Sequence, residues 1–144
     1  MTHYQTPITK EFQKRQWHLI DVAGLTLGRI STKIAGLLIG KGLPGFSYHQ
    51  DSGDFVVVIN TDKIRVTGDK LNSKIYNSYS GFPGGLKSLS LKQLMAKDST
   101  LVIKNAVAGM IPKNRLRHLR MARLKIFASS QHPFTSNFIS QDKK

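Results

Sequence analysis

The stretch Phe55-Val56-Val57-Val58-Ile59 decides the fold class of this chain. It is a continuous run of apolar, mostly β-branched residues, bounded by Asp54 and Asn60. A short uninterrupted run of this kind is typical of a strand that is buried on both faces of a parallel sheet. We therefore expect the chain to form a parallel sheet that contains this segment.

The residues before this run predict a strand followed by a helix. Residues 17–22 are β-branched and aromatic and end close to a glycine, which favours a strand. The leucines and isoleucines of residues 27–38 recur at helical spacing, between Thr26 as an N-cap and Gly40 as a C-cap. Residues 41–53 are rich in Gly, Pro, Ser and His and indicate a loop. The order strand, helix, strand is the repeating unit of a parallel sheet.

Weaker patterns follow in the second half of the chain. We expect a short strand at 63–67, a turn at 68–70 and an extended segment at 74–79. Three helices should follow: one from a Ser90 cap to Lys97, one capped by Ser99 and ended by Pro112, and one at 113–124. A last strand is expected at 124–128. Strands that alternate with helices predict an α/β domain with a small, mainly parallel sheet covered on both faces.

The length and composition of the chain fit a single domain of ordinary size. We expect the 144 residues to divide into an extended N-terminal arm (1–16), a single α/β domain (17–128) and a C-terminal tail (129–144). The strongly apolar run at 55–59 is far below the roughly 18 to 20 residues of a membrane span, and the polar N-terminus does not resemble a signal peptide. The chain has no cysteine, which excludes disulfides, thiolate metal sites and a cysteine nucleophile.

The charge points to a polyanionic partner. The chain carries 22 Lys and Arg against 8 Asp and Glu, a formal charge of +14. The 43 residues from Ser99 to Gln141 hold seven cations and no acid. A surplus of this size repels itself in a compact chain and is usually neutralised by a bound polyanion. Nucleic acid is therefore the first partner class to consider, and an anionic membrane surface the second.

Two segments carry the expected nucleic-acid contacts. On a helix over 113–124, Lys113, Arg117 and Arg120 share one face without any Glu to pair with, which favours phosphate binding over a merely solvated face. Arg115 and Arg123 fall among the apolar positions of that helix. The glycine-rich segment 80–87 lies among lysines and aromatics and favours contact with a nucleic-acid backbone over a simple tight turn.

Enzymatic motifs are weak. Residues 40–45 match G-x-G-x-x-G, but these glycines follow a helix, whereas dinucleotide binding needs a strand before them and a helix after them. The five histidines are scattered, and the mostly single aspartates indicate neither a metal site nor a catalytic carboxylate pair. A nucleic-acid-processing enzyme and, more weakly, a nucleotide-binding oxidoreductase remain as alternatives.

An ordered set of short motifs also extends from about residue 16 to 133. It comprises Trp17 with Ile20-Asp21, Leu27-Gly28-Arg29-Ile30, Gly40-Lys41, Gly53-Asp54, Val58-Ile59-Asn60, Val66-Thr67-Gly68, Ser80-Gly81-Phe82-Pro83-Gly84-Gly85-Leu86-Lys87, Gly109-Met110-Ile111-Pro112-Lys113-Asn114 and Leu124-Lys125-Ile126-Phe127. In this order and spacing, the set resembles the family of large ribosomal subunit protein thirteen of bacterial type. The chain departs from the family pattern at Arg117, at Phe134 and in the loop 42–49.

The resemblance implies a three-layer α/β/α fold and a non-enzymatic role in the large ribosomal subunit. It implies binding to large-subunit ribosomal RNA early in assembly, contacts with neighbouring ribosomal proteins, and no cofactor, metal, membrane or small-molecule substrate. The ribosome would be cytoplasmic, although the sequence leaves an organellar ribosome open. The RNA contacts that we predict are Lys41, Lys70, Lys74, Tyr79, Gly81, Phe82, Gly84, Gly85, Lys87, Lys113, Asn114, Arg115, Arg117, Arg120 and Arg123.

Overall fold

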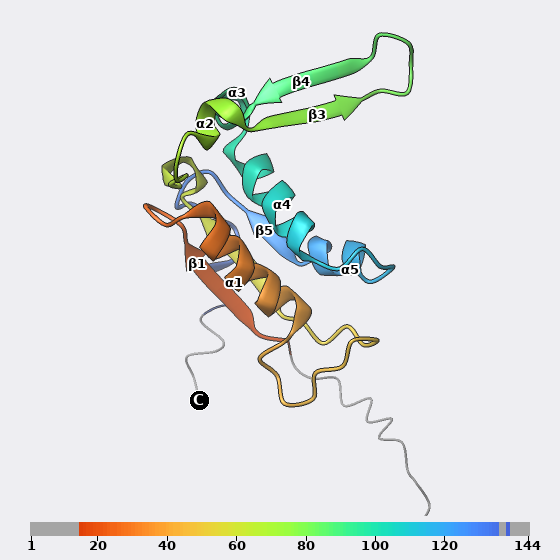
Figure 1. The fold of residues 1–144 in the computed structure, drawn as a ribbon. Helices are drawn as coiled ribbons and strands as arrows, with labels where there is room; N and C mark the ends of the chain where they lie inside the picture. Colours follow the sequence, from red (N-terminus) through yellow and green to blue (C-terminus); the bar gives the residue numbers. More distant parts are fainter. Residues whose placement is uncertain (1–14, 136–137, 139–144) are drawn as a thin grey trace, which may run out of the picture.

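A three-stranded parallel sheet forms the centre of the molecule (Figure 1). The structure, a computed structural model, describes residues 15–135 and residue 138. The strands are β1 (Trp17–Asp21), β2 (Phe55–Ile59) and β5 (Leu124–Ile126), in the order β1-β2-β5. Val56, Val57 and Val58 of the central strand are fully buried. The predicted α/β class and the parallel sheet around residues 55–59 are confirmed.

Two long helices, α1 (Leu27–Ile39) and α4 (Ser99–Met110), pack together and form the main core with the sheet. The core includes Val56 and Val58 of β2, whose side chains share one face of the sheet. Helix α1 ends where the glycine pattern predicts, because Gly40 adopts the left-handed conformation (φ 84°) and its N–H bonds to carbonyls of the last turn. Thr26 occupies the N-cap position, but its side chain makes no capping hydrogen bond.

Aromatic side chains gather on the other face of the sheet. The rings of Trp17 and Phe55 belong to neighbouring strands and stack at 4.4 Å. Phe134 stacks on Trp17 at 5.3 Å, and Phe138 meets the same ring edge-on at 6.3 Å. Side chains from the predicted C-terminal tail thus pack on this face, which holds the fully buried Val57.

A second, antiparallel sheet projects from the body of the molecule (Figure 1). It is the hairpin of β3 (Ile75–Tyr79) and β4 (Leu86–Ser90), which follows the single-turn helix α2 (Lys70–Ser73). The extended segment at 74–79 is confirmed, whereas β4 and α2 were not predicted. Helix α3 (Leu91–Lys97) begins at the predicted Ser90 cap, which forms a reciprocal capping box with Gln93.

The predicted strand at 63–67 is wrong. A 3₁₀ turn, η1 (Thr61–Lys63), occupies its start, because Asn60 adopts a left-handed conformation (φ 61°) that turns the chain away from β2. Only one bridge, between Thr26 and Arg65, remains of the expected pairing. The alternation of apolar residues is real, since Ile64 is buried, but the segment has no partner strand along its length.

Two further predictions about helix starts need correction. Helix α4 is capped by Asp98, which accepts a hydrogen bond from the N–H of Thr100 at 2.9 Å. Ser99 is instead buried at the first helical position, where its hydroxyl meets the hydroxyl of Thr61. The helix expected at 113–124 is only the short α5 (Arg117–Ala122), and the four residues before it form a bend and a turn. The last strand is confirmed over three residues of the predicted five.

None of the helices in the described part of the chain is long and apolar enough to cross a membrane.

Candidate nucleic-acid interface

Two adjoining hollows lie along helix α4. The first, about 480 Å³, is open and lies between α4 and the segment that leads into α5. The second, about 300 Å³, lies between α4, the start of α1 and the residues around α2. Asn105 of α4 borders both hollows, which makes them one surface. We call this surface the basic groove.

Five cations line the basic groove. Lys104, Arg115 and Arg117 line the first hollow, and Lys70 and Lys74 line the second. No Asp or Glu is among the described residues that line either hollow. The groove therefore has a single sign of charge, and its cations are available to an anionic ligand.

Arg117 also has a structural role at the edge of the groove. Its Nη2 donates to the carbonyl of Ala108 at 2.7 Å, which ties the start of α5 to α4. His118 is the second residue of α5, and its Nδ1 lies 3.3 Å from the carbonyl of Arg115 in the preceding turn. These contacts fix the wall of the groove, because the turn preceding α5 has no other regular structure.

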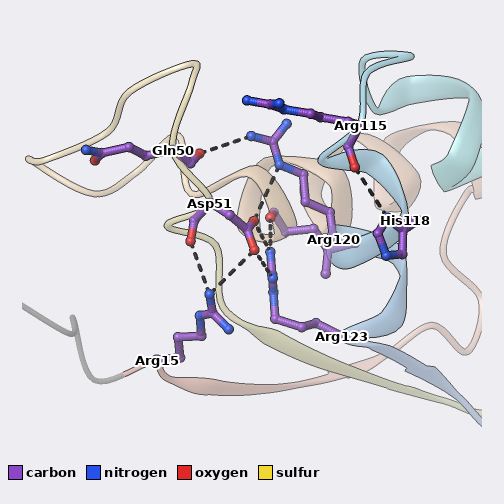
Figure 2. Close-up of polar contacts among 8 residues, drawn as sticks. Arg15, Gln50, Asp51, Arg115, His118, Arg120 and Arg123 are labelled. Atoms are coloured by element: carbon purple, nitrogen blue, oxygen red, sulfur yellow. Dashed lines mark hydrogen bonds and ion pairs between the residues drawn. The ribbon is translucent and has the colours of Figure 1, made fainter. Parts of the chain in front are cut away.

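Arg120 and Arg123 do not lie on the expected exposed face. Their exposed fractions are 1% and 4%, and both guanidinium groups converge on Asp51 (Figure 2). Arg123 forms a bidentate pair with the Asp51 carboxylate, at 2.5 and 2.6 Å, and also donates to the carbonyl of Leu38 at 3.2 Å. The Nε of Arg120 lies 3.6 Å from the same carboxylate. The prediction that Lys113, Arg117 and Arg120 share one phosphate-binding helical face is therefore wrong.

Asp51 is the centre of this cluster, which also includes Arg15 at 3.5 Å. Burial of the carboxylate opposes its ionisation, but the hydrogen bonds and charge of Arg123 outweigh that effect, with help from Arg15 and Arg120. The pKa of Asp51 is consequently lowered from its ordinary value of 3.8. Asp51 thus stays ionised and joins the loop 41–53, the start of β1 and helix α5.

The structure brings only part of the predicted site together. Lys70, Lys74, Asn114, Arg115 and Arg117 line the basic groove. Lys41 and Lys113 are exposed but line neither hollow. Arg120 and Arg123 are buried around Asp51. The other six predicted residues lie on the β3–β4 hairpin or its tip: Tyr79, Gly81, Phe82, Gly84, Gly85 and Lys87.

The hairpin residues form a second exposed region. Phe82 at the tip is 73% exposed and Tyr79 is 65% exposed. At the base, the Nζ of Lys74 lies 5.3 Å from the centre of the Tyr76 ring, a cation–π contact that holds this lysine between the hairpin and the groove. The hairpin and the groove are therefore neighbouring parts of one surface.

Sequence reasoning missed three polar residues of the first hollow: Lys104, Asn105 and His118. Lys104 and Asn105 belong to the acid-free stretch, and both lie on the exposed side of a helix whose apolar residues are buried. Helical spacing of the buried residues Ile103 and Val107 is the pattern that could have indicated them. His118 gives no comparable pattern, because its position depends on the turn that leads into α5.

The glycines at 40–45 do not form a nucleotide-binding turn. They end α1 and lead into a loop, so that no helix N-terminus follows them. Among residues 15–135 and 138, no three His, Asp or Glu side chains come together as a metal site would require.

Comparison with known proteins identifies the family. The family model described as Ribosomal protein L13 matches residues 15–133. The chain belongs to the ribosomal protein L13 family. Relatives named large ribosomal subunit protein uL13, from Azotobacter vinelandii and Pseudomonas syringae pv. syringae, are 49% and 50% identical over 126 residues, which cover 88% of this chain and 89% of each relative.

Membership of the L13 family confirms the resemblance drawn from the ordered motifs. It makes the chain a ribosomal protein and not an enzyme, so both enzymatic alternatives are wrong. The basic groove is accordingly a surface of a ribosomal protein, and the ligands to consider for it are components of the ribosome.

Proposed function

We propose that this L13-family chain is a structural component of the large ribosomal subunit and binds large-subunit ribosomal RNA along the basic groove. The names of its relatives support the subunit, and their bacterial sources support a cytoplasmic ribosome. Early entry into assembly and contacts with neighbouring ribosomal proteins, which the family resemblance implies, belong to the same proposal.

The observation that carries the proposal is the groove itself. Its lining combines five cations with no carboxylate among the described residues, in a chain of net charge +14. RNA phosphates that contact these side chains would release condensed counterions, which supplies affinity without sequence recognition. Asn105 and Asn114 add amide donors and acceptors for ribose hydroxyls and phosphate oxygens.

The hairpin extends the same contact beyond the groove. Lys87 of β4 and the glycine-rich tip continue the hairpin away from Lys74 at its base, and Phe82 offers an exposed ring on which an unpaired base can stack. A projecting two-stranded hairpin has little core of its own, so RNA contact would also stabilise it.

The decisive experiment removes Lys104 and Arg115, two exposed groove cations whose side chains form no hydrogen bond or ion pair with the described residues. The variant is Lys104→Gln with Arg115→Gln in the full chain. Glutamine keeps a long polar side chain at both positions and the helix propensity of α4 at position 104. We expect lower affinity for large-subunit ribosomal RNA and a log–log salt slope that shrinks by roughly 1 to 2, at about 0.7 to 0.9 per lost phosphate contact.

The matched control is Arg29→Gln with Lys33→Gln on α1, which removes one Arg and one Lys that line neither hollow. Both double variants should melt within about 2 °C of the parent, because all four side chains are exposed. Equal losses of affinity in the two variants would mean that net charge alone drives binding, and the groove would lose its assigned role.

A further inference from the structure

The second hollow of the basic groove is lined by residues of two kinds. Its volume is about 300 Å³, at the lower end of the roughly 300 to 1,000 Å³ of ligand pockets. Its apolar lining comes from α1, α3, α4 and the segment before α2: Leu27, Val66, Leu91, Ala106 and Met110. Its polar lining consists of Thr26, Thr67, Lys70, Lys74 and Asn105. Apolar walls with a few polar groups are the usual form of a site that takes a small organic group.

The apolar lining is held in place by the core. Leu27 and Leu91 are themselves buried core residues. The Sδ of Met110 accepts a hydrogen bond from the hydroxyl of Thr32 on α1 at 3.4 Å. A ligand that enters the hollow therefore meets a preformed surface, which lowers the entropic cost of binding.

Two glycines complete the lining of the second hollow. Gly28 belongs to the first turn of α1, and Gly109 belongs to the last turn of α4. Glycine is a poor helix former, yet a Cβ added at either position would contact no packed neighbour within 4 Å. Packing inside the described part of the chain thus gives no reason for a glycine at these positions. A bare backbone does allow a ligand to approach both helices closely.

The charge of the lining restricts what the hollow can hold. Lys70 and Lys74 are exposed, and no Asp or Glu is among the described residues that line this hollow. An anionic occupant is therefore favoured. A purely apolar protein side chain would gain nothing from the lysines, and an acidic side chain would leave the apolar lining uncovered. A nucleotide satisfies both parts, because its base is a flat group with apolar faces and its phosphate is an anion.

We propose that the second hollow takes one unpaired nucleotide of the bound ribosomal RNA, with its base against the apolar lining and its phosphate beside Lys70 and Lys74. This assignment rests on the proposed function, since Asn105 joins the second hollow to the rest of the basic groove. A base inside a duplex is paired and stacked, so only a nucleotide in a loop, a bulge or a single strand can enter. The hollow therefore gives the groove a preference for RNA with an unpaired nucleotide, which the cations alone do not provide.

The test fills the hollow without changing any charge. In the full chain, Gly28→Ala with Gly109→Ala adds a methyl group on each of the two helices, and Gly109→Leu adds a larger side chain on α4. Gly36→Ala is the matched control, because Gly36 is a glycine of α1 with the same free space and lines neither hollow. Alanine favours a helix more than glycine does, so the alanine variants should melt at or above the temperature of the parent.

Binding is measured with a short RNA of mixed sequence, once as a single strand and once paired with its complement. We expect the double alanine variant to bind the single strand roughly tenfold more weakly, as overpacking by added methyl groups does elsewhere. Gly109→Leu should bind the single strand more weakly still. Affinity for the duplex should stay at the parental value in every variant, because no cation is lost.

Parental affinity of the filled variants for the single strand would overturn the nucleotide site, and so would an equal loss of affinity for the duplex. The proposed function would still stand if Lys104→Gln with Arg115→Gln weakens RNA binding, and would fall if that variant binds as the parent does. Parental RNA binding with poor incorporation of the filled variants into large subunits would indicate an acidic protein segment in the hollow, and would equally overturn the nucleotide site.

Discussion

Replacing Asp51 with Asn should leave three arginines without their shared counterion. Asp51→Asn keeps the shape of the side chain but removes the charge that faces Arg123 at 2.5 and 2.6 Å, Arg120 at 3.6 Å and Arg15 at 3.5 Å. The side chains of Arg120 and Arg123 are only 2% and 5% exposed, so their charges would stay buried without a counterion. Breaking a buried ion pair in this way costs about 3 to 5 kcal/mol.

The low end of that range applies here. Asp51 is itself 15% exposed, and an asparagine oxygen can still accept one hydrogen bond from Arg123. We therefore expect the free energy of unfolding to fall by about 3 kcal/mol, which for a chain of this size lowers the melting temperature by about 10 °C. Thermal unfolding followed by circular dichroism at pH 7 measures this directly.

The pH dependence of the difference is fixed by the sign of the pKa shift. Because the pKa of Asp51 is lowered in the folded state, its ionised form stabilises the protein at pH values above the ordinary value of 3.8. This stabilisation is lost as the pH falls from 3.8 through the lower folded-state pKa. The gap between the parent and Asp51→Asn should therefore be constant near neutrality and narrow in strong acid.

Asp69→Asn is the control, because Asp69 is an exposed turn carboxylate that accepts a hydrogen bond from Asn72. It should change the unfolding free energy by no more than about 0.5 kcal/mol. A melting temperature of Asp51→Asn within about 2 °C of the parent would refute the view that Asp51 compensates the buried arginines.

Two further substitutions test the sheet and the loop before it. Val57→Asp should abolish cooperative unfolding, since it buries an unpaired charge in the central strand. Leu19→Asp should still fold, because Leu19, the residue paired with Val57 on β1, is 47% exposed. A normal melting curve for Val57→Asp would contradict the burial of β2 in the sheet. Gly53→Ala should lower the unfolding free energy by at least about 2 kcal/mol, because a Cβ there would overlap the backbone of Leu38. Gly42→Ala meets open space and should change stability by less than about 0.5 kcal/mol; equal melting of the two alanine variants would count against the close approach.

The elements that the sequence predicts well are those with a periodic apolar pattern and a local end signal. The run at 55–59 and the stripe at 27–38 report burial directly, and Gly40 and Ser90 provide local signals at a helix end and a helix start. Such patterns need no knowledge of the rest of the fold, because burial and capping are set by neighbouring residues.

The hairpin strand β4 was not predicted, because it lacks the burial pattern that marks the other elements. Four of its five residues are exposed, so no burial pattern marks it, and its pairing with β3 is visible only in three dimensions. The prediction of a strand at 63–67 was wrong although the segment has the burial pattern of a strand. Ile64 is buried as a strand residue would be, but the segment pairs only with residues 24–27, through a single bridge at Arg65, and not with a strand of the sheet.

The prediction of a basic helical face at 113–124 was wrong because Asp51, the counterion of Arg120 and Arg123, is distant in sequence. The stretch around α5 contains no acid, which favours exposed arginines, yet Arg123 meets Asp51 across 72 positions. A helical projection assigns arginine to the outside and leucine to the inside, whereas Arg120 is buried and Leu119 is 44% exposed. Only tertiary structure separates the cations that serve the fold from those that line the groove.

The most direct measurement is the structure of a large ribosomal subunit that contains this chain, determined by electron cryomicroscopy. The proposal predicts ribosomal RNA phosphates within hydrogen-bond distance of Lys70 and Lys104 and of the Arg115 guanidinium, along the length of the basic groove. A groove that faces solvent, or that is filled by another protein, would contradict the account.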